Sequence, residues 1–316
     1  MGRQTADLVV DIGGTKVLMA LVHEDLVLDR SRFVSSGVED PSSLVASVAG
    51  GALEMARRGG RAIGTVLVAC PGAVDRSQGV VREAANLPFN NFPLASALSQ
   101  SLGGTEVVLE RDVMCGVIGE ASYGAAQGMG DVSYLTLSTG IGMASLVEGK
   151  RLGGSHGWAG EVGHVAVVRD GRLCGCGARG CLEAYASGRA IGLLGQELLA
   201  AGGGRLLGPT APDHRAVTAA DVVAAAEKGD ESCEEILSGA ARFVSDAIGL
   251  VRRLLDPEVV VLGGGLMNSD TFAKVVFAAV AQSGVCAGGL KVARATLGAD
   301  SVIMGGMRLL AGGPEP

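Results

Sequence analysis

The stretch that best indicates the fold is residues 8–16, LVVDIGGTK. Its first three residues are aliphatic, as in a short buried strand, and a second aliphatic run begins at Lys16. The two glycines between the runs allow a tight turn, because glycine adopts backbone dihedrals that other residues avoid. In such a turn the N–H groups of Gly13 and Gly14 can face an anion, while Thr15 and Lys16 add a hydroxyl and a cation. We therefore predict two strands joined by a turn that holds phosphate.

A second turn of the same kind lies farther along the chain. Residues 139–142, TGIG, directly follow a strand candidate at residues 133–137, and this turn would hold the same phosphates from the opposite side. Asp11 ends the first strand, where its carboxylate would hold Mg²⁺ through water, since hard cations prefer oxygen. The alternative is a pair of ordinary hairpin turns without a ligand. In the second turn, the residues predicted to face phosphate are Thr139, Gly140 and Gly142.

Short apolar runs alternate with longer helical patterns along almost the whole chain, which predicts an α/β fold. No linker or low-complexity segment separates the halves, and the longest stretch with little regular pattern is the glycine-rich region 153–180. A loop of that length is usually functional. The predicted strands are residues 8–10, 16–22, 63–68, 106–109, 133–137 and 259–262, and the predicted helices are residues 44–58, 114–123, 219–228, 233–255, 272–282 and 302–310.

The composition excludes several classes of protein. A chain of 316 residues has the length of roughly two domains and a core that needs no disulfides. Its 26 Lys and Arg against 33 Asp and Glu give a net charge of −7 without a basic cluster, so a nucleic-acid partner is not expected. The sequence contains neither a membrane-length apolar run nor a signal-peptide pattern, nor a P-loop or dinucleotide-binding glycine motif. We expect a cytoplasmic protein with no membrane partner.

Three of the seven cysteines lie within eight residues, at Cys174, Cys176 and Cys181, with His164 ten residues upstream. One histidine and three cysteines make a closed tetrahedral set of the kind that holds structural zinc. The alternative is a disulfide, which an acidic chain of cytoplasmic appearance disfavours. If zinc takes His164, a catalytic base has to be a carboxylate. The carboxylates next to motif glycines or turns are Asp75, Asp112, Glu161 and Glu183.

These motifs together closely resemble the ROK family of bacterial sugar kinases and sugar-responsive repressors. The resemblance covers residues 8 to about 310, and its most specific part is the combination of Glu-x-Gly-His with Cys-x-Cys-x4-Cys. Each motif alone is weak evidence, but all of them occur here in the family's order. The matching segments are residues 11–16, 86–88, 93–94, 139–142, 159–164, 174–183 and 261–265.

The resemblance implies an actin-like, hexokinase-like (ribonuclease H-like) fold of two α/β domains around a central cleft. Residues 1–112 with residues 300–316 would form the small domain, and residues 113–299 the large domain with its zinc-binding loop. The phosphates of ATP would lie between the two glycine turns, with Mg²⁺, and structural Zn²⁺ would be held by the cysteine–histidine set. The adenosine would lie near Gly263, Gly264 and Gly265, where bulky side chains would block its approach.

The resemblance also assigns roles around a sugar substrate. Asp112 would be the catalytic base that accepts the proton of the attacking hydroxyl, usually O6. Glu161 and Glu183 would accept hydrogen bonds from sugar hydroxyls, and His164 would bind zinc through one ring nitrogen and face the sugar with the other. The full set implied to surround the sugar is Gly72, Asn86, Arg111, Asp112, Glu161, His164 and Glu183.

One departure bears on specificity: Arg111 stands where family kinases usually have Asn. A cation there is expected to lower the pKa of Asp112 and to change the hydrogen bonding at the sugar. The leading hypothesis is an ATP-dependent sugar kinase, glucokinase-like, acting on glucose, an amino sugar or a cyclitol. The alternatives are a sugar-responsive transcriptional regulator, disfavoured because only ten residues precede Asp11, and a non-catalytic sugar-binding protein. Family members usually assemble, as homodimers or homotetramers. The sequence leaves open which sugar is used and whether ATP or another phosphoryl donor serves.

Overall fold

A computed structural model describes residues 4–35, 37–38, 40–84, 87–155, 157–210 and 216–312 of the chain. The chain forms two compact units. Unit 1 contains residues 1–128, 149–159 and 300–316, and unit 2 contains residues 129–148 and 160–299. The domain division expected from the sequence, after residues 112 and 299, stays a prediction.

Unit 1 is built on a sheet whose strands follow the order β3-β2-β1-β4-β8. Strand β1 pairs antiparallel with β2 and parallel with β4, and β4 pairs parallel with β8. The carboxyl ends of β1, β4 and β8 therefore meet at one edge of the sheet, where Asp11 is opposite Ala69 and Cys70 is opposite Arg111. The strands are β1 (Thr5–Ile12), β2 (Lys16–His23), β3 (Leu26–Val34), β4 (Ala62–Cys70) and β8 (Val107–Arg111).

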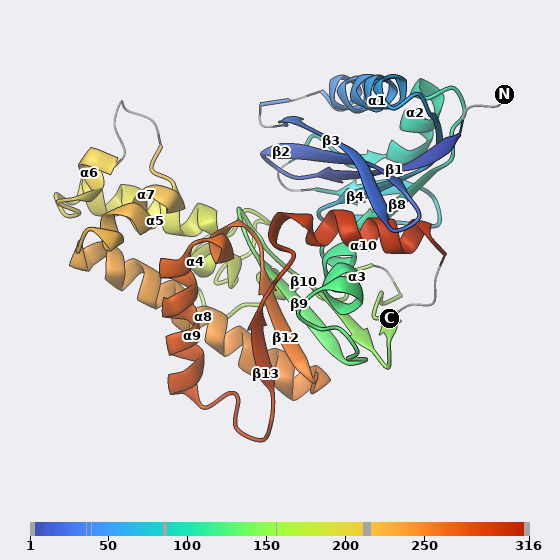
Figure 1. The fold of residues 1–316 in the computed structure, drawn as a ribbon. Helices are drawn as coiled ribbons and strands as arrows, with labels where there is room; N and C mark the ends of the chain where they lie inside the picture. Colours follow the sequence, from blue (N-terminus) through green and yellow to red (C-terminus); the bar gives the residue numbers. More distant parts are fainter. Residues whose placement is uncertain are drawn as a thin grey trace. The chain divides into compact units, whose positions relative to one another are not determined.

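Helices cover both faces of this sheet (Figure 1). Helices α1 (Pro41–Arg58) and α2 (Leu94–Ser101) pack on the face that includes Leu8 and Val10. Helices α3 (Asp112–Tyr123) and α10 (Ser301–Leu310) pack on the face that includes Val9. Neighbouring side chains of a strand point to opposite faces of the sheet. The aliphatic residues 8–10 of β1 therefore pack against the helices on both faces. A small sheet adds β5 (Ala73–Asp75), β6 (Val80–Glu83) and β7 (Asn90–Phe92).

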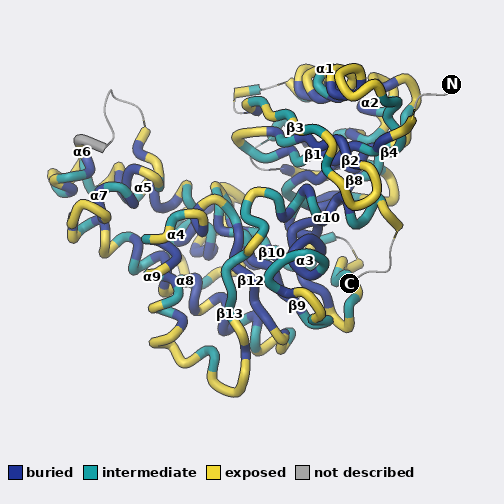
Figure 2. Tube along the Cα trace, in the orientation of Figure 1, coloured by how far each residue is buried: buried dark blue, intermediate teal, exposed yellow. Residues whose placement is uncertain are grey.

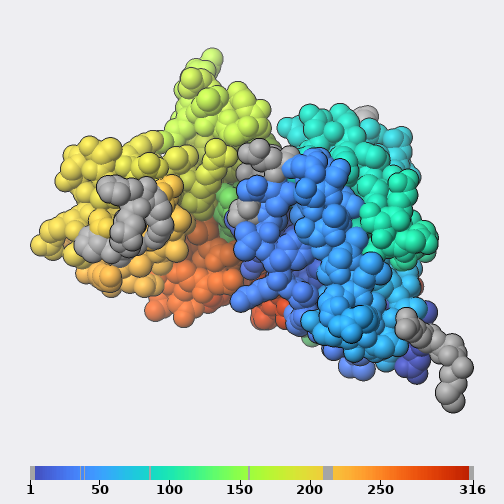
Figure 3. All heavy atoms as spheres, turned by 90° about the horizontal axis from the view of Figure 1, so that it is seen from above, coloured from blue at the N-terminus to red at the C-terminus, as the bar shows by residue number. Residues whose placement is uncertain are grey.

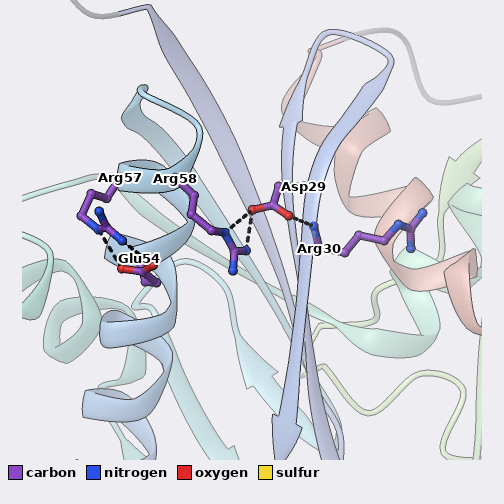
Figure 4. A network of polar contacts seen from close by, with 5 residues as sticks. All are labelled: Asp29, Arg30, Glu54, Arg57 and Arg58. Carbon is purple, nitrogen blue, oxygen red and sulfur yellow. Dashed lines mark hydrogen bonds and ion pairs between the residues drawn. The ribbon is translucent and has the colours of Figure 1, made fainter.

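Helix α1 shows how local sequence sets the ends of an element. Asp40 caps its first turn by accepting hydrogen bonds from the backbone N–H groups of Ser42 and Ser43, so the helix begins at Pro41, three residues before the predicted start. The outer face of α1 lies on the surface seen in Figure 3, and Figure 2 shows buried and exposed residues mixed along its length. At its other end the Arg58 guanidinium binds Asp29 of β3 at 3.1 Å (Figure 4). This hydrogen bond lowers the pKa of the Asp29 carboxyl.

Helices α3 and α10 pack against each other through glycines. A Cβ atom at Gly305 would overlap the carbonyl oxygen of Cys115, and one at Gly119 would overlap the carbonyl oxygen of Ser301. The buried carboxylate of Glu120 fixes the crossing further, since it accepts hydrogen bonds from the Ser301 hydroxyl at 2.7 Å and from the Ala125 N–H at 2.9 Å. The backbones of the two helices therefore lie close together, and α10 supports α3.

Unit 2 contains strands in the order β10-β9-β12-β13, with β9 antiparallel to β10 and parallel to β12. Its core joins these strands to the long helix α8 and to α7 and α9. The strands are β9 (Val132–Leu137), β10 (Ile141–Val147), β12 (Val259–Gly263) and β13 (Lys291–Arg294), and β11 (Lys150–Arg151) lies in the segment assigned to unit 1. The helices are α4 (Glu183–Ala186), α5 (Gly188–Ala200), α6 (Leu207–Thr210), α7 (Ala219–Glu227), α8 (Glu231–Leu255) and α9 (Asp270–Ser283).

The region predicted to have little regular structure contains one short 3-10 turn, Val162–His164, among its described residues. Two further 3-10 turns are Gly265–Asn268 and Gly298–Asp300. Among the residues that the structure describes, no helix is both long and apolar enough to cross a membrane.

Because α3 and α10 have no room for a side chain at Gly305, we expect Gly305→Ala to lower the free energy of unfolding by about 2 kcal/mol. Gly50→Ala is the matched control, since Gly50 lies in α1 with open space around its Cβ position and alanine favours a helix by up to about 1 kcal/mol. Thermal melting of both variants measures the difference. A Gly305→Ala variant as stable as the parent protein would contradict the close packing.

Candidate active site

Asp11 and Asp112 form a carboxylate pair at the carboxyl edge of the unit 1 sheet. The pKa of Asp11 is raised to about 7, chiefly by burial and also by the negative charge of Asp112, while the charge of Lys16 opposes both. The buried thiols of Cys70 and Cys115 lie within the field of the same two carboxylates, which together with burial raises the pKa of each thiol. Two acids that repel each other in this way fit a divalent cation, because a bound cation offsets both charges.

The turn between β1 and β2 is fixed by a hydrogen bond of its own and by two hydrogen bonds from Ser35. The N–H of Gly13 donates to the Lys16 carbonyl at 2.9 Å, which closes the turn over residues 13–16. Ser35 buttresses it, because its hydroxyl donates to the Gly13 carbonyl at 2.7 Å and its N–H donates to the Thr15 carbonyl at 3.1 Å. Sequence reasoning missed Ser35, which lies nineteen residues after the turn and belongs to no recognisable motif.

Asp112 begins α3, directly after β8, so the strand and the helix fix its position. Gly72 follows β4 with a φ of +87°, and a Cβ there would overlap the carbonyl oxygen of Glu83, so only glycine fits. Asn86 lies outside the described residues. Asp75, the other aspartate considered as a base, accepts hydrogen bonds from Ser77 and Arg82, which lower its pKa and make it a weak base.

Arg111 is 7% exposed, and its Nη1 donates to the Ala159 carbonyl at 2.6 Å. The preceding residue, Glu110, is 3% exposed and accepts from the N–H of Arg111 at 2.9 Å. Its carboxylate also pairs with Arg76 at 3.0 Å and with Arg151 at 3.1 Å. Sequence reasoning missed this buried ion network behind the carboxylate pair. The expectation that Arg111 lowers the pKa of Asp112 stays a prediction.

In unit 2 the turn at residues 138–141 is tied to a distant segment. The N–H of Ile141 donates to Oε2 of Glu183 at 2.8 Å, and a Cβ at Gly140 would lie 2.5 Å from the same oxygen. The N–H of Gly188 donates to the Ser138 carbonyl at 2.7 Å. Glu183, which the family resemblance assigns to the sugar, therefore contacts the turn that the sequence predicts to hold phosphate.

The four residues expected to bind zinc come together. One ligand atom from each of His164, Cys174, Cys176 and Cys181 lies within 4.8 Å of the others. The Nδ1 of His164 is 3.7 Å from the sulfur of Cys174, and the sulfurs of Cys176 and Cys181 are 3.8 Å apart. A tetrahedral zinc ion with bonds of about 2.3 Å to sulfur separates its ligands by about 3.6–3.8 Å. The donor types and spacings thus fit zinc.

The segment that contains Glu161 and His164 packs tightly on β10. A Cβ at Gly160 would overlap the Met143 carbonyl oxygen, and one at Gly163 would overlap that of Ile141. With Nδ1 of His164 turned toward the cysteines, its Nε2 lies 3.9 Å from Oε2 of Glu161. These two polar atoms face each other at a distance that one hydroxyl group can bridge.

Of the three glycines at residues 263–265, two pack against neighbouring protein groups and one lines a cavity. A Cβ at Gly263 would overlap the Tyr134 hydroxyl, and one at Gly264 would lie 2.5 Å from the Leu137 carbonyl oxygen, so these two glycines serve packing. Gly265 lines a cavity of about 440 Å³, a size that suits a small ligand. Sequence reasoning missed the remaining walls of this cavity, which are Ala219, Ala220, Val223, Ala224, Glu227, Leu266, Asn268, Ser269 and Asp270.

Two α/β units, a carboxylate pair at the edge of parallel strands and a glycine turn beside a cysteine–histidine cluster define the class of this protein. It has the actin-like, hexokinase-like fold, as similarity to solved hexokinase and glucokinase structures confirms. The ROK family model matches residues 8–312, and the chain belongs to the ROK family.

Individual relatives are moderately similar over most of their length. The glucokinase of Thermotoga maritima is 34% identical over 265 residues, 82% of each chain. The N-acetylmannosamine kinase of Shigella boydii is 29% identical, over 87% of this chain and 88% of that one. The crystal structure of a ROK family glucokinase from Streptomyces griseus in complex with glucose and AMPPNP has a TM-score of 0.83, with 29% identity, and covers 96% of this chain and 98% of that chain.

We expect freshly purified protein to contain about one zinc ion per chain, and Cys176→Ser to lose it and to melt at a lower temperature. Cys176 is exposed, so its replacement leaves the core unchanged. Cys286→Ser, outside the cluster, is the control and should keep the metal. Elemental analysis measures the zinc content, and its absence from the parent protein would contradict the assignment.

Proposed function

We propose that this chain transfers the γ-phosphoryl group of ATP to a hydroxyl, O6, of a hexose-like sugar. It is an ATP-dependent sugar kinase, as its membership of the ROK family and its glucokinase relatives support. The observation that carries the proposed mechanism is the pair of Asp11 and Asp112: burial, together with the charge of Asp112, raises the pKa of Asp11 to about 7. Such a pair suits one carboxylate that holds a cation and a second that accepts a proton.

Asp112 is proposed as the base. Its carboxylate would take the proton of the sugar hydroxyl as the hydroxyl oxygen attacks phosphorus, and the bond between that phosphorus and the bridging oxygen of ADP would break. Mg²⁺, held through water by Asp11, would neutralise phosphate charge. Phosphoryl transfer otherwise needs positioning, for which the turn at residues 13–16, closed by its own hydrogen bond and buttressed by Ser35, is rigid enough.

The residues of unit 2 support binding of the nucleotide. The turn at residues 139–142 would take phosphate, with Thr139, Gly140 and Gly142 as its proposed contacts. The cavity beside Gly265 is large enough for a nucleoside and combines apolar alanine walls with polar groups such as Asn268. Gly263 and Gly264 shape the backbone around it. The ATP donor is thereby supported by a site of suitable size and chemistry.

For the sugar we propose Gly72, Asn86, Arg111, Glu161, His164 and Glu183 as its surroundings. The paired arrangement of Glu161 Oε2 and His164 Nε2 supports binding of one hydroxyl group between them. Glucose is the first substrate to test, with amino sugars and cyclitols next, because the relatives include an N-acetylmannosamine kinase and because Arg111 replaces the usual Asn. The proposed setting is cytoplasmic, as a homodimer or homotetramer.

Repressors also occur among the relatives. The xylose repressor of Caldicellulosiruptor bescii is 28% identical over 197 residues, and this chain covers 49% of its length. A regulator or a non-catalytic sugar binder needs no base, whereas this chain retains Asp112 beside Asp11. We therefore favour the kinase. An assay of ADP release across hexoses, amino sugars and cyclitols tests it, and failure of every sugar to elicit ADP release would contradict it.

With the best sugar from that assay, Asp112→Asn should lower kcat by at least about 10²-fold, the scale of general base catalysis. The sugar Kd, measured by calorimetry, should stay within about threefold, since the amide keeps the shape of the side chain. Asp75→Asn is the control for loss of an acid outside the carboxylate pair. Near-normal turnover by Asp112→Asn would overturn its role as the base.

A further inference from the structure

We propose that the zinc-binding loop positions the phosphate turn of unit 2 through the carboxylate of Glu183, so that zinc and Glu183 set the affinity for nucleotide. The proposal rests on the nucleotide site proposed above and gives Glu183 a role beyond a contact with the sugar. The segment responsible is residues 181–189, called the bridging segment below. All of its contacts described here lie within unit 2.

The bridging segment contacts the turn at three points. Oε2 of Glu183 accepts the N–H of Ile141 at 2.8 Å. The N–H of Gly188 donates to the Ser138 carbonyl at 2.7 Å, and the N–H of Arg189 donates to the Thr139 carbonyl at 3.3 Å. These bonds hold three of the four residues from 138 to 141, so the conformation of the turn depends on where the bridging segment lies.

The space at Gly140 shows how closely the carboxylate approaches. A Cβ on Gly140 would lie 2.5 Å from Oε2 of Glu183 and 3.3 Å from its carboxyl carbon, and its three nearest neighbouring atoms all belong to that side chain. The backbone dihedrals of Gly140 are not in the left-handed region, so another residue is possible there on conformational grounds. Glycine at this position therefore makes room for the carboxylate of Glu183.

The same segment is fastened to the zinc loop. It begins at Cys181, one of the four proposed zinc ligands. The N–H of Leu182 donates to the Val165 carbonyl at 3.0 Å, and Cys181 forms an isolated bridge with Ala166. At its far end, Nη1 of Arg189 lies 3.6 Å from the position of a Cβ on Gly175. Contacts with the metal loop thus lie on both sides of Glu183.

Zinc would fix this arrangement. Apart from the short turn Val162–His164 and the isolated bridges Ala166–Cys181 and Leu173–Arg179, the described residues of the loop lack regular secondary structure, and Cys176 is exposed. A loop of this composition loses conformational freedom when four of its side chains bind one ion. Only Leu182 lies between Cys181 and Glu183, so a zinc ion that fixes Cys181 also restricts the Glu183 carboxylate and the turn that would hold phosphate.

The test measures binding of AMPPNP with Mg²⁺ by calorimetry, in the absence of sugar. Glu183→Ala should raise the Kd about tenfold. Glu183→Gln should stay within about threefold, because its amide oxygen can accept the same N–H of Ile141. Removal of zinc by a chelator should raise the Kd at least as much as Glu183→Ala, and restored zinc should reverse it. Circular dichroism checks that each sample is folded.

A double-mutant cycle keeps the proposal testable even if zinc removal unfolds the loop. Gly140→Ala should raise the Kd about tenfold alone but less than about twofold in the Glu183→Ala background, where the obstructing carboxylate is gone. Additive effects, or an unchanged Kd in Glu183→Ala, would overturn the inference. If the unaltered protein binds no nucleotide, the proposed function fails instead, so the two failures are distinguishable.

Discussion

The burial of the Asp11 carboxylate within the field of Asp112 is the constraint around which unit 1 is arranged. The two residues come from β1 and from the junction of β8 with α3, and they meet because β1, β4 and β8 are parallel and end at the same edge. Burial disfavours the ionised form of Asp11, and the charge of Asp112 adds to this, as the raised pKa of Asp11 shows. The surrounding structure is correspondingly rigid: Ser35 braces the first turn, and α10 packs on α3 at backbone distance.

In unit 2 the corresponding constraint is the set of three cysteines and one histidine. Their spacings match the ligand spacings of a tetrahedral ion, and the segment that follows Cys181 contacts the turn after β9 through Glu183. The loop that contains the cysteine–histidine set and the turn at residues 138–141 are therefore joined by direct hydrogen bonds. On the proposed function, a structural metal influences catalysis through the donor site without contact with the reacting atoms.

Much of this could be predicted from the sequence, because the signals are local. Alternate residues of the run from Leu8 to Val10 face the two helical layers, as strand periodicity requires, and the spacing of Cys174, Cys176 and Cys181 indicates a metal loop. The strand β3 (Leu26–Val34) and the helix α5 (Gly188–Ala200) were not predicted. In strand β3 every second residue is exposed and residues 29–32 are all polar, so no alternating apolar pattern marks it and its pairing with β2 decides its structure. The glycines of α5 weaken the helical pattern of that segment.

The glycines show most clearly where sequence reasoning stops. Glycine at residues 140, 263 and 264 predicts that another group approaches the backbone closely. The sequence suggests that this group is phosphate at residue 140 and adenosine at residues 263 and 264. The structure shows protein groups close to each of them: Glu183 at Gly140, the Tyr134 hydroxyl at Gly263 and the Leu137 carbonyl at Gly264. The predicted contacts with a nucleotide stay predictions. Which partner comes close depends on residues far away in the chain, so a local pattern can indicate the need for space but not what fills it.

The central claim is that the carboxylate pair is built to receive a cation, and proton release on binding tests it most directly. With a pKa of about 7, Asp11 is half protonated at pH 7 without ligand and must ionise to hold Mg²⁺. Calorimetric titration with Mg²⁺ and AMPPNP in buffers of different ionisation enthalpy should therefore show release of about half a proton at pH 7. The release should fall toward zero by pH 9 and be absent in Asp11→Asn. Binding without buffer-dependent heat at pH 7 would contradict the account.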